Sequence, residues 1–203
     1  MVNKNKIETD LQYYMMSSKY KIDDMGIVHV DGNVHCDRLP KNKQMPVQFG
    51  RVTGDFCIAA GLQPMSLKGS PQYVGKWFLI DRNNQITSLE HGPTQVDGSY
   101  TVEVGNPIKS LKGVAPYVGK NLNIFSPTLK ELNDLPENLK SVHVAYNKHI
   151  PVLRLLTAQH AYVQNATIGM QKILDKYQGQ GKPGALKAAA ELIRSGYKEH
   201  ARW

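Results

Sequence analysis

A period of about 22 residues constrains this chain more than any other feature. The phrase SLKGSP begins at residue 66, SLKGVAP begins at 110, and a looser copy, SLEHGP, begins at 88. Apolar residues recur at this spacing at Met45, Leu67, Leu89, Leu111 and Leu132. Glycines recur at a similar spacing at Gly32, Gly54, Gly75, Gly98 and Gly119. Two markers that share one period indicate stacked structural repeats.

Each repeat has the same internal order. A short alternating run follows the glycine, as in GNVHC, GDFCI, GKWFL and GSYTV, and alternation predicts a strand with one buried face. The residues predicted to point inward are Val34 and Cys36, Phe56 and Ile58, Trp77 and Leu79, Tyr100 and Val102, and Leu122 and Ile124. The leucine phrase then returns the chain to the core. Prolines mark the following corner at Pro71, Pro93, Pro116 and Pro136.

The length of the repeat distinguishes between the known repeat architectures. Repeats of paired helices need 33 residues or more, whereas leucine-rich repeats need about 20–29. One such unit cannot bury its own apolar face, but stacked units can. The sequence therefore predicts an α+β chain built on a leucine-rich-repeat-like β-solenoid of about five units, each 21–23 residues long, over residues 32–148.

The units resemble short leucine-rich-type repeats of uncharacterised tailed-bacteriophage proteins. The matching stretches are VDGNVHC, MPVQFGRVTGDF, NNQITSLEHGP and NPIKSLKGVAPYVG, within residues 27–145. Asn84 and Asn106 stand at the asparagine position of that pattern, whereas Gly61 and Pro127 stand near it in other units. The repeat architecture predicts a non-enzymatic protein-binding module. The resemblance implies that the chain is phage-encoded and acts in the cytoplasm of an infected bacterium, where its partner is a host protein that it inhibits or redirects.

The two ends differ from the repeats and are expected to cap them. Residues 1–31 predict a helix over about 6–19, followed by a hairpin that turns at Asp31-Gly32. Residues 149–203 form a predicted helical region after a strand at 141–147. Its last helix is expected to have Leu186, Ala190 and Ile193 on one face, Pro183 in its first turn and Gly196 at its stop, after a loop at 179–184.

The positive charge is concentrated in the last part of the chain. The formal net charge is +8, and residues 151–203 carry eight basic and three acidic side chains. The basic candidates for phosphate contacts are Lys172, Lys176, Lys182, Lys187, Arg194, Lys198 and Arg202. These residues suggest nucleic-acid or ribonucleoprotein binding as an alternative function. A solubilising helical surface explains the same pattern.

No catalytic or cofactor motif stands out. The chain has no G-x-S-x-G and no paired carboxylates, and GQGKPG has Pro183 where a phosphate loop needs Ser or Thr. His35, Cys36 and Cys57 lack the paired spacing of a zinc site. The N-terminal segment has no apolar stretch of a secretory signal, and no run of 18 apolar residues predicts a membrane span. We expect no enzyme, cofactor, metal or membrane partner.

The outward face of the predicted strands is the best binding candidate. If the inward set above holds, an exposed apolar patch with a charged rim results, which is typical of a protein-partner site. Its residues are Phe78, Ile80, Arg82, Glu103 and Phe125. The alternative is that other segments cover this face and make the apolar members core. A virion structural component is a weaker functional alternative.

Overall fold

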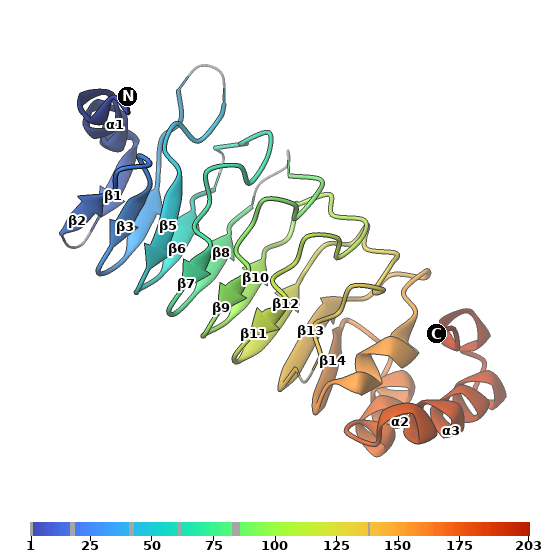
Figure 1. Cartoon of the computed structure of the whole chain (residues 1–203). Coiled ribbons are helices and arrows are strands. Elements are labelled where there is room, and N and C mark those ends of the chain that lie inside the picture. The colour runs from blue at the N-terminus through green and yellow to red at the C-terminus, as the bar shows by residue number, and fades with distance from the viewer. Residues whose placement is uncertain (1, 17–18, 41–42, 61, 83–85, 138) are drawn as a thin grey trace.

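The computed structural model describes residues 1–203 except 1, 17–18, 41–42, 61, 83–85 and 138. The chain forms an elongated stack of coils with helices at both ends (Figure 1). In the described part, strands of successive coils align into two long sheets, and this confirms the predicted α+β solenoid. The coils from β3 to β12 each place one short strand in each sheet, joined by a tight corner, whereas β13 and β14 extend only one of the two sheets.

One sheet has eight strands in the part of the chain that the structure describes. Their spatial order is β1 (Tyr14–Met16), β4 (Val34–Cys36), β6 (Phe56–Ile58), β8 (Phe78–Ile80), β10 (Tyr100–Val102), β12 (Asn121–Ile124), β13 (Ser141–Ala145) and β14 (His160–Gln164). All neighbours are parallel except β1 and β4. Successive coils thus add strands to this sheet in register.

The other sheet has six strands within the same described ranges. Their order is β2 (Tyr20–Ile22), β3 (Val28–Val30), β5 (Phe49–Val52), β7 (Tyr73–Val74), β9 (Gln95–Val96) and β11 (Tyr117–Val118). Only β2 and β3 pair antiparallel. The recurring valines of this sheet face the core and are buried at Val30, Val52, Val74, Val96 and Val118.

The core is a set of ladders that run along the stack. One ladder holds Val34, Phe56, Phe78, Tyr100 and Leu122 in register. The rings of Phe56 and Phe78 stack with centroids 5.9 Å apart, and Tyr100 follows 4.8 Å beyond Phe78. The predicted inward leucines Leu67, Leu89, Leu111 and Leu132 are fully buried. The repeated phrase is therefore the inward return of each coil.

The prediction for the strand after Gly75 was wrong. Phe78 and Ile80 are fully buried, whereas Trp77 is 45% exposed and Leu79 is half-buried. The reason is the spacing of the glycines, which alternates between shorter and longer steps while the inward residues keep a constant step. The extra residue sits in the corner, so stacking of the core, rather than the distance from the glycine, fixes which residues point inward.

The corner glycines are required by close approach between coils. A Cβ atom on Gly75, Gly98 or Gly119 would clash with a backbone carbonyl oxygen of the preceding coil. Backbone bonds also link these corners, as from Gly119 N to Val96 O at 2.8 Å. Glycine recurs here because any side chain would push neighbouring coils apart.

The N-terminal cap differs from the prediction in two ways. Helix α1 spans only Lys4–Asp10 and continues as a short 3-10 turn, η1 (Leu11–Tyr13), before the chain extends into β1. Tyr14 leaves the helix because its buried ring packs edge-on against Phe49 at 4.9 Å. The predicted hairpin at Asp31-Gly32 is instead the first corner, since β3 and β4 lie in different sheets.

The C-terminal region continues the solenoid before it turns helical. The predicted strand over 141–147 is confirmed as β13, but β14 was not predicted. The helices are η2 (Val152–Thr157), α2 (Ile168–Tyr177), α3 (Gly181–Arg194) and η3 (Lys198–His200). Buried side chains from Leu11 to Leu192 form one continuous core, so these helices pack onto the last coils.

Helix α3 buries a different side from the one predicted. Pro183 lies in its first turn and Gly196 follows its end at φ +85°, as expected, but the helix begins inside the predicted loop. Leu186 and Ile193 are exposed, and the buried side is made by Ala185, Ala188 and Leu192. Small alanines face inward where η2 of the last coil and helix α2 pack against α3.

Two glutamine side chains form hydrogen bonds with the free edge of β14. Gln171 belongs to α2, and Gln178 directly follows this helix. Gln171 accepts a hydrogen bond from Val163 N at 3.1 Å and donates to Ala161 O at 3.0 Å. Gln178 accepts from Ala161 N at 2.9 Å. Side-chain amides thus take the place of another strand, which ends the sheet without leaving its backbone groups unpaired.

Candidate binding surface

The structure separates the residues predicted for partner binding. Phe78 and Ile80 are fully buried core residues, so their predicted place on an exposed patch was wrong. Arg82 is exposed, and Glu103 and Phe125 are half-buried just beyond β10 and β12. The latter two follow equivalent strands and remain near the outer side of the stack. The apolar centre expected between them is absent from this surface of the described chain.

The outward row of the eight-stranded sheet has a different composition. It runs in register through His35, Cys57, Leu79, Thr101, Asn123, His143 and Tyr162. Asn123 Nδ2 donates to Thr101 Oγ1 at 3.0 Å, and the rings of His143 and Tyr162 meet edge-on at 5.7 Å. Burial lowers the pKa of His143, so its imidazole is favoured in the neutral form. The row is mixed polar and apolar.

Trp77 stands at the corner beside this row in a fixed orientation. Its indole Nε1 donates to Thr101 Oγ1 at 2.9 Å, and its backbone N donates to Asp55 Oδ1 at 2.9 Å. Thr101 is only 1% exposed although it lies on the outer side of the sheet. One hydrogen bond thus holds the indole and the other holds the backbone of Trp77, while the residue is 45% exposed.

Two hollows flank Trp77. One, of about 220 Å³, lies toward the N-terminal coils and is lined by Asn33, Val34, His35, Asp55, Cys57, Trp77 and Leu79. The other, of about 330 Å³, lies over the glycine corners and is lined by Gly75, Lys76, Trp77, Asp97, Gly98, Ser99 and Lys120. The indole is the wall between them. We call Trp77 with both hollows the Trp77 surface.

Charges at the Trp77 surface are of both signs. Asp97 accepts hydrogen bonds from Gln95 Nε2 at 2.7 Å and Tyr73 Oη at 2.6 Å. These donors lower the pKa of Asp97, the amide of Gln95 contributing most, so the carboxylate stays ionised at neutral pH. Lys76 and Lys120 lie beside it. The arrangement offers a rigid aromatic group with nearby anionic and cationic groups.

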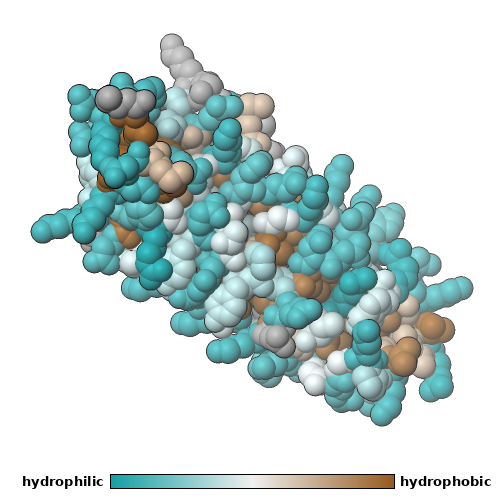
Figure 2. All heavy atoms as spheres, in the orientation of Figure 1, coloured by the Kyte–Doolittle hydropathy of each residue, from teal (hydrophilic) through white to brown (hydrophobic). Residues whose placement is uncertain are grey.

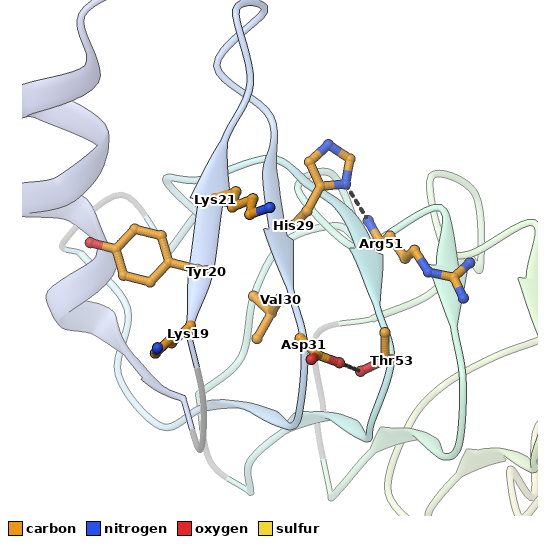
Figure 3. A pocket seen from close by; sticks show the side chains of 8 residues that line it. All are labelled: Lys19, Tyr20, Lys21, His29, Val30, Asp31, Arg51 and Thr53. Carbon is orange, nitrogen blue, oxygen red and sulfur yellow. Dashed lines mark hydrogen bonds between the residues drawn. The ribbon is translucent and has the colours of Figure 1, made fainter.

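A third hollow, of about 440 Å³, lies on the outer side of the six-stranded sheet near the N-terminus (Figure 3). Its lining residues are Lys19, Tyr20, Lys21, His29, Val30, Asp31, Arg51 and Thr53. They come from the outer strands β2, β3 and β5 and from the adjoining corner residues. We call this hollow the N-terminal trough.

The basic residues at the C-terminal end are not one continuous patch. Lys176 is paired with Glu191 at 2.6 Å, and Arg202 donates to His149 O at 2.6 Å. The hydrogen bond between them lowers the pKa of the Glu191 carboxyl and raises the pKa of the Lys176 amine. Lys187 and Arg194 lie on the exposed side of α3. The predicted basic set is therefore divided between paired and solvent-facing groups.

Apolar side chains are exposed beside those cations. Leu186 is 76% exposed, Ile193 51% and Trp203 47%. A hollow of about 280 Å³ lies between Leu186, Trp203 and Leu153. Figure 2 shows hydrophobic atoms at the surface of this end among hydrophilic ones. The reversed orientation of α3 creates this feature, which the sequence prediction missed.

The two cysteines point to opposite sides of the sheet. Cys36 faces the core, and Cys57 lies on the outer row beneath Trp77 and Leu79. Burial raises the pKa of Cys36 to about 12 and that of Cys57 to about 11, so both are protonated thiols at neutral pH. Within the described residues, no group of three or more His, Cys, Asp or Glu side chains is placed to hold a metal ion.

Sequence reasoning missed Trp77 as a surface residue. A signal for it existed, since counting 22 residues back from Tyr100 or forward from Phe56 gives Phe78 as the inward position. No helix in the described part of the chain is long and apolar enough to cross a membrane. Comparisons of the chain with protein-family models, curated proteins and solved structures found no match.

Proposed function

We propose that this chain is a non-enzymatic module that binds a protein partner through the Trp77 surface. The observation that carries the proposal is Trp77, which is 45% exposed although its indole is anchored to Thr101 and its backbone N to Asp55. Tryptophan is enriched among residues that dominate binding energy at protein interfaces. A side chain that is already fixed loses little conformational entropy on binding.

The shape of the Trp77 surface favours a protein over a small molecule. Its hollows of about 220 and 330 Å³ lie side by side across one aromatic wall. Each could accept one side chain of a partner, and the stacked corners would contact the partner's backbone. Asp55, Asp97, Lys76 and Lys120 would supply the polar rim that protein interfaces usually have.

The resemblance to tailed-bacteriophage repeats suggests where the chain comes from and which kind of partner it binds. On that basis, the chain is phage-encoded and acts in the cytoplasm of an infected bacterium. Its partner is then a host protein whose activity is blocked or redirected. The stacked repeats serve as a rigid scaffold that presents Trp77 and its surroundings.

Affinity capture tests the proposal. The tagged chain and its Trp77→Ala variant are incubated with bacterial lysate, with and without nuclease, at moderate salt. A stoichiometric protein that resists nuclease and is lost with Trp77→Ala is the expected result. As a matched control, Trp203→Ala removes the chain's other tryptophan and should retain the partner. Retention of every captured protein by Trp77→Ala would contradict the proposed surface.

Nucleic-acid binding is the second candidate, supported by the solvent-facing cations Lys187 and Arg194 on α3. Phosphate contacts of this kind give binding that weakens steeply with salt. In the same capture experiment, this function predicts a broad set of proteins that disappears with nuclease. Lys187→Gln combined with Arg194→Gln would abolish that set, whereas Trp77→Ala would leave it unchanged.

A further inference from the structure

The charged and polar side chains of the N-terminal trough come from three neighbouring strands, β2, β3 and β5. Lys21 on β2 is the register partner of His29 on β3, and the backbone N of Arg51 on β5 donates to His29 Nδ1 at 3.2 Å. Lys19 precedes β2 beside Asp31. In Figure 3 Lys21 points toward His29, the Arg51 guanidinium extends toward the next strand, and Lys19 lies on the same side of β2 as the ring of Tyr20.

The carboxylates around the trough already have partners. Asp31 Oδ1 accepts from Thr53 Oγ1 at 2.8 Å. Asp23 accepts from the backbone N of Ile27 at 2.8 Å and of Met25 at 2.9 Å. These bonds hold both carboxylates in place, and among the described residues neither forms an ion pair with Lys19 or Lys21.

Both ring nitrogens of His29 have partners within the chain. Its Nδ1 accepts a hydrogen bond from the backbone N of Arg51 at 3.2 Å, and its Nε2 lies 3.3 Å from Asp23 Oδ2. This contact and the two backbone donors lower the pKa of Asp23, the Ile27 amide contributing most. The ring of His29 therefore connects β3 with β5 and with Asp23.

The cations of the trough have no carboxylate partner. Among the described residues, Lys19, Lys21 and Arg51 take part in no ion pair. The Arg51 guanidinium is held in place by the ring of Tyr73, 3.8 Å below it. Tyr73 is fixed in turn by its hydrogen bond to Asp97 at 2.6 Å. Arg51 is thus oriented by Tyr73, its positive charge also acts on Asp97, and it forms no ion pair with a carboxylate in the described part of the chain.

We propose that the N-terminal trough binds an organic phosphate monoester. The residues that line the hollow of about 440 Å³ carry three cations and one carboxylate, Asp31, a net charge of +2, and Asp23 beside His29 reduces this to +1. A phosphate monoester carries nearly two negative charges at neutral pH. Arg51 would supply paired donors to the phosphate oxygens, and the two lysines would neutralise the remaining charge. The aliphatic stems of the lysines and the floor of β-strand backbone would contact the organic group.

Isothermal titration of the whole chain with phenyl phosphate, AMP and phosphotyrosine tests this directly. We expect saturable one-to-one binding for at least one of them, with Kd on the order of 0.1–1 mM for an open site. Inorganic phosphate should bind at least about threefold more weakly, because it lacks the organic group. AMP binding without phosphotyrosine binding identifies a free nucleotide as the source, and the reverse identifies a phosphorylated side chain.

Variants locate the site. Arg51→Gln should weaken the best ligand about tenfold or more, whereas Arg51→Lys should recover only part of the loss because it cannot donate in pairs. Lys68→Gln, an exposed lysine outside the trough, is the matched control and should bind as the wild type does. Equal Kd values for the wild type and Arg51→Gln, or no saturable binding by any probe at 10 mM, would overturn the proposal. Because the readout is direct ligand binding, neither result depends on the Trp77 surface.

Discussion

The indole Nε1 of Trp77 and the hydroxyl of Thr101 meet at 2.9 Å across two neighbouring coils. The bond joins a corner residue to a strand residue 24 positions later in the chain. It explains why a threonine on the outer side of a sheet is only 1% exposed. The contact also connects the stability of the stack with the orientation of the candidate binding group.

Thr101→Val should remove the hydrogen bond that orients the Trp77 indole without creating a cavity, because valine and threonine have similar volumes. The substitution leaves Trp77 Nε1 and Asn123 Nδ2 without their shared acceptor, which should cost about 1–2 kcal/mol of unfolding free energy. In a Trp203→Phe background, the emission of Trp77 should also broaden and shift. Denaturant unfolding monitored by fluorescence measures both. Thr87→Val, an exposed control, should leave both quantities unchanged.

Phe78→Ala should be among the most damaging single substitutions. Its ring is fully buried between Phe56 and Tyr100, so truncation should cost about 3–5 kcal/mol. Leu79→Ala, at the next position and half-buried on the outer row, should cost about 1 kcal/mol. Urea unfolding distinguishes the two. Similar losses for both variants would contradict the assigned facing of β8.

Gly98→Ala should strain the stack although it adds one methyl group. The new Cβ would meet the backbone carbonyl of Lys76 in the preceding coil, and a backbone group has little freedom to move aside. We expect a loss of about 3 kcal/mol or more. Ser99→Ala serves as the neighbouring control, with a loss below about 1 kcal/mol. A fully stable Gly98→Ala protein would show that the coils are not in close contact there.

Gln171→Leu should leave backbone groups at the β14 edge of the eight-stranded sheet without hydrogen-bond partners. It removes the acceptor of Val163 N and the donor to Ala161 O, which should cost about 2 kcal/mol. Amide exchange at Val163 should accelerate, and an exposed edge should promote self-association at high concentration. Lys172→Gln on the next exposed position should change neither property. Exchange by mass spectrometry and light scattering provide the readouts.

The buried thiols predict an alkaline loss of stability. Burial raises the pKa of Cys36 to about 12 and of Cys57 to about 11, whereas an unfolded cysteine has a pKa near 8.5. The folded state therefore holds these protons more tightly, and stability should fall as pH rises from about 8.5 toward the folded values. At pH 8, a disulfide reagent such as DTNB should label the folded chain slowly and the urea-unfolded chain at once. Rapid labelling of folded protein would contradict this burial.

The period made the architecture predictable because stacking forces equivalent residues into register. Leu67, Leu89 and Leu111 could be assigned to the core from spacing alone, and all three are fully buried. The facing of Trp77 could not be obtained by counting from Gly75, since the corner accommodates one more residue without shifting the core ladder. A count along the core ladder itself would have corrected it.

The ends were less predictable because tertiary contacts decide them. Tyr14 has helical spacing in the sequence, yet packing against Phe49 takes it into a strand. On α3, either the leucine side or the alanine side could face inward, and close packing against the last coils selects the alanines. The N-terminal trough combines residues of three strands, and no local sequence motif predicts that these residues lie close together.

Hydrogen–deuterium exchange of the chain with and without its captured partner tests the central claim most directly. The account predicts protection of the peptides that contain Trp77 and Thr101 and of the corner at Gly98, with residues of α3 unchanged. Protection confined to α3 and the tail beyond it, with the corner peptides exchanging as in the free chain, would contradict the assignment of the Trp77 surface as the binding site.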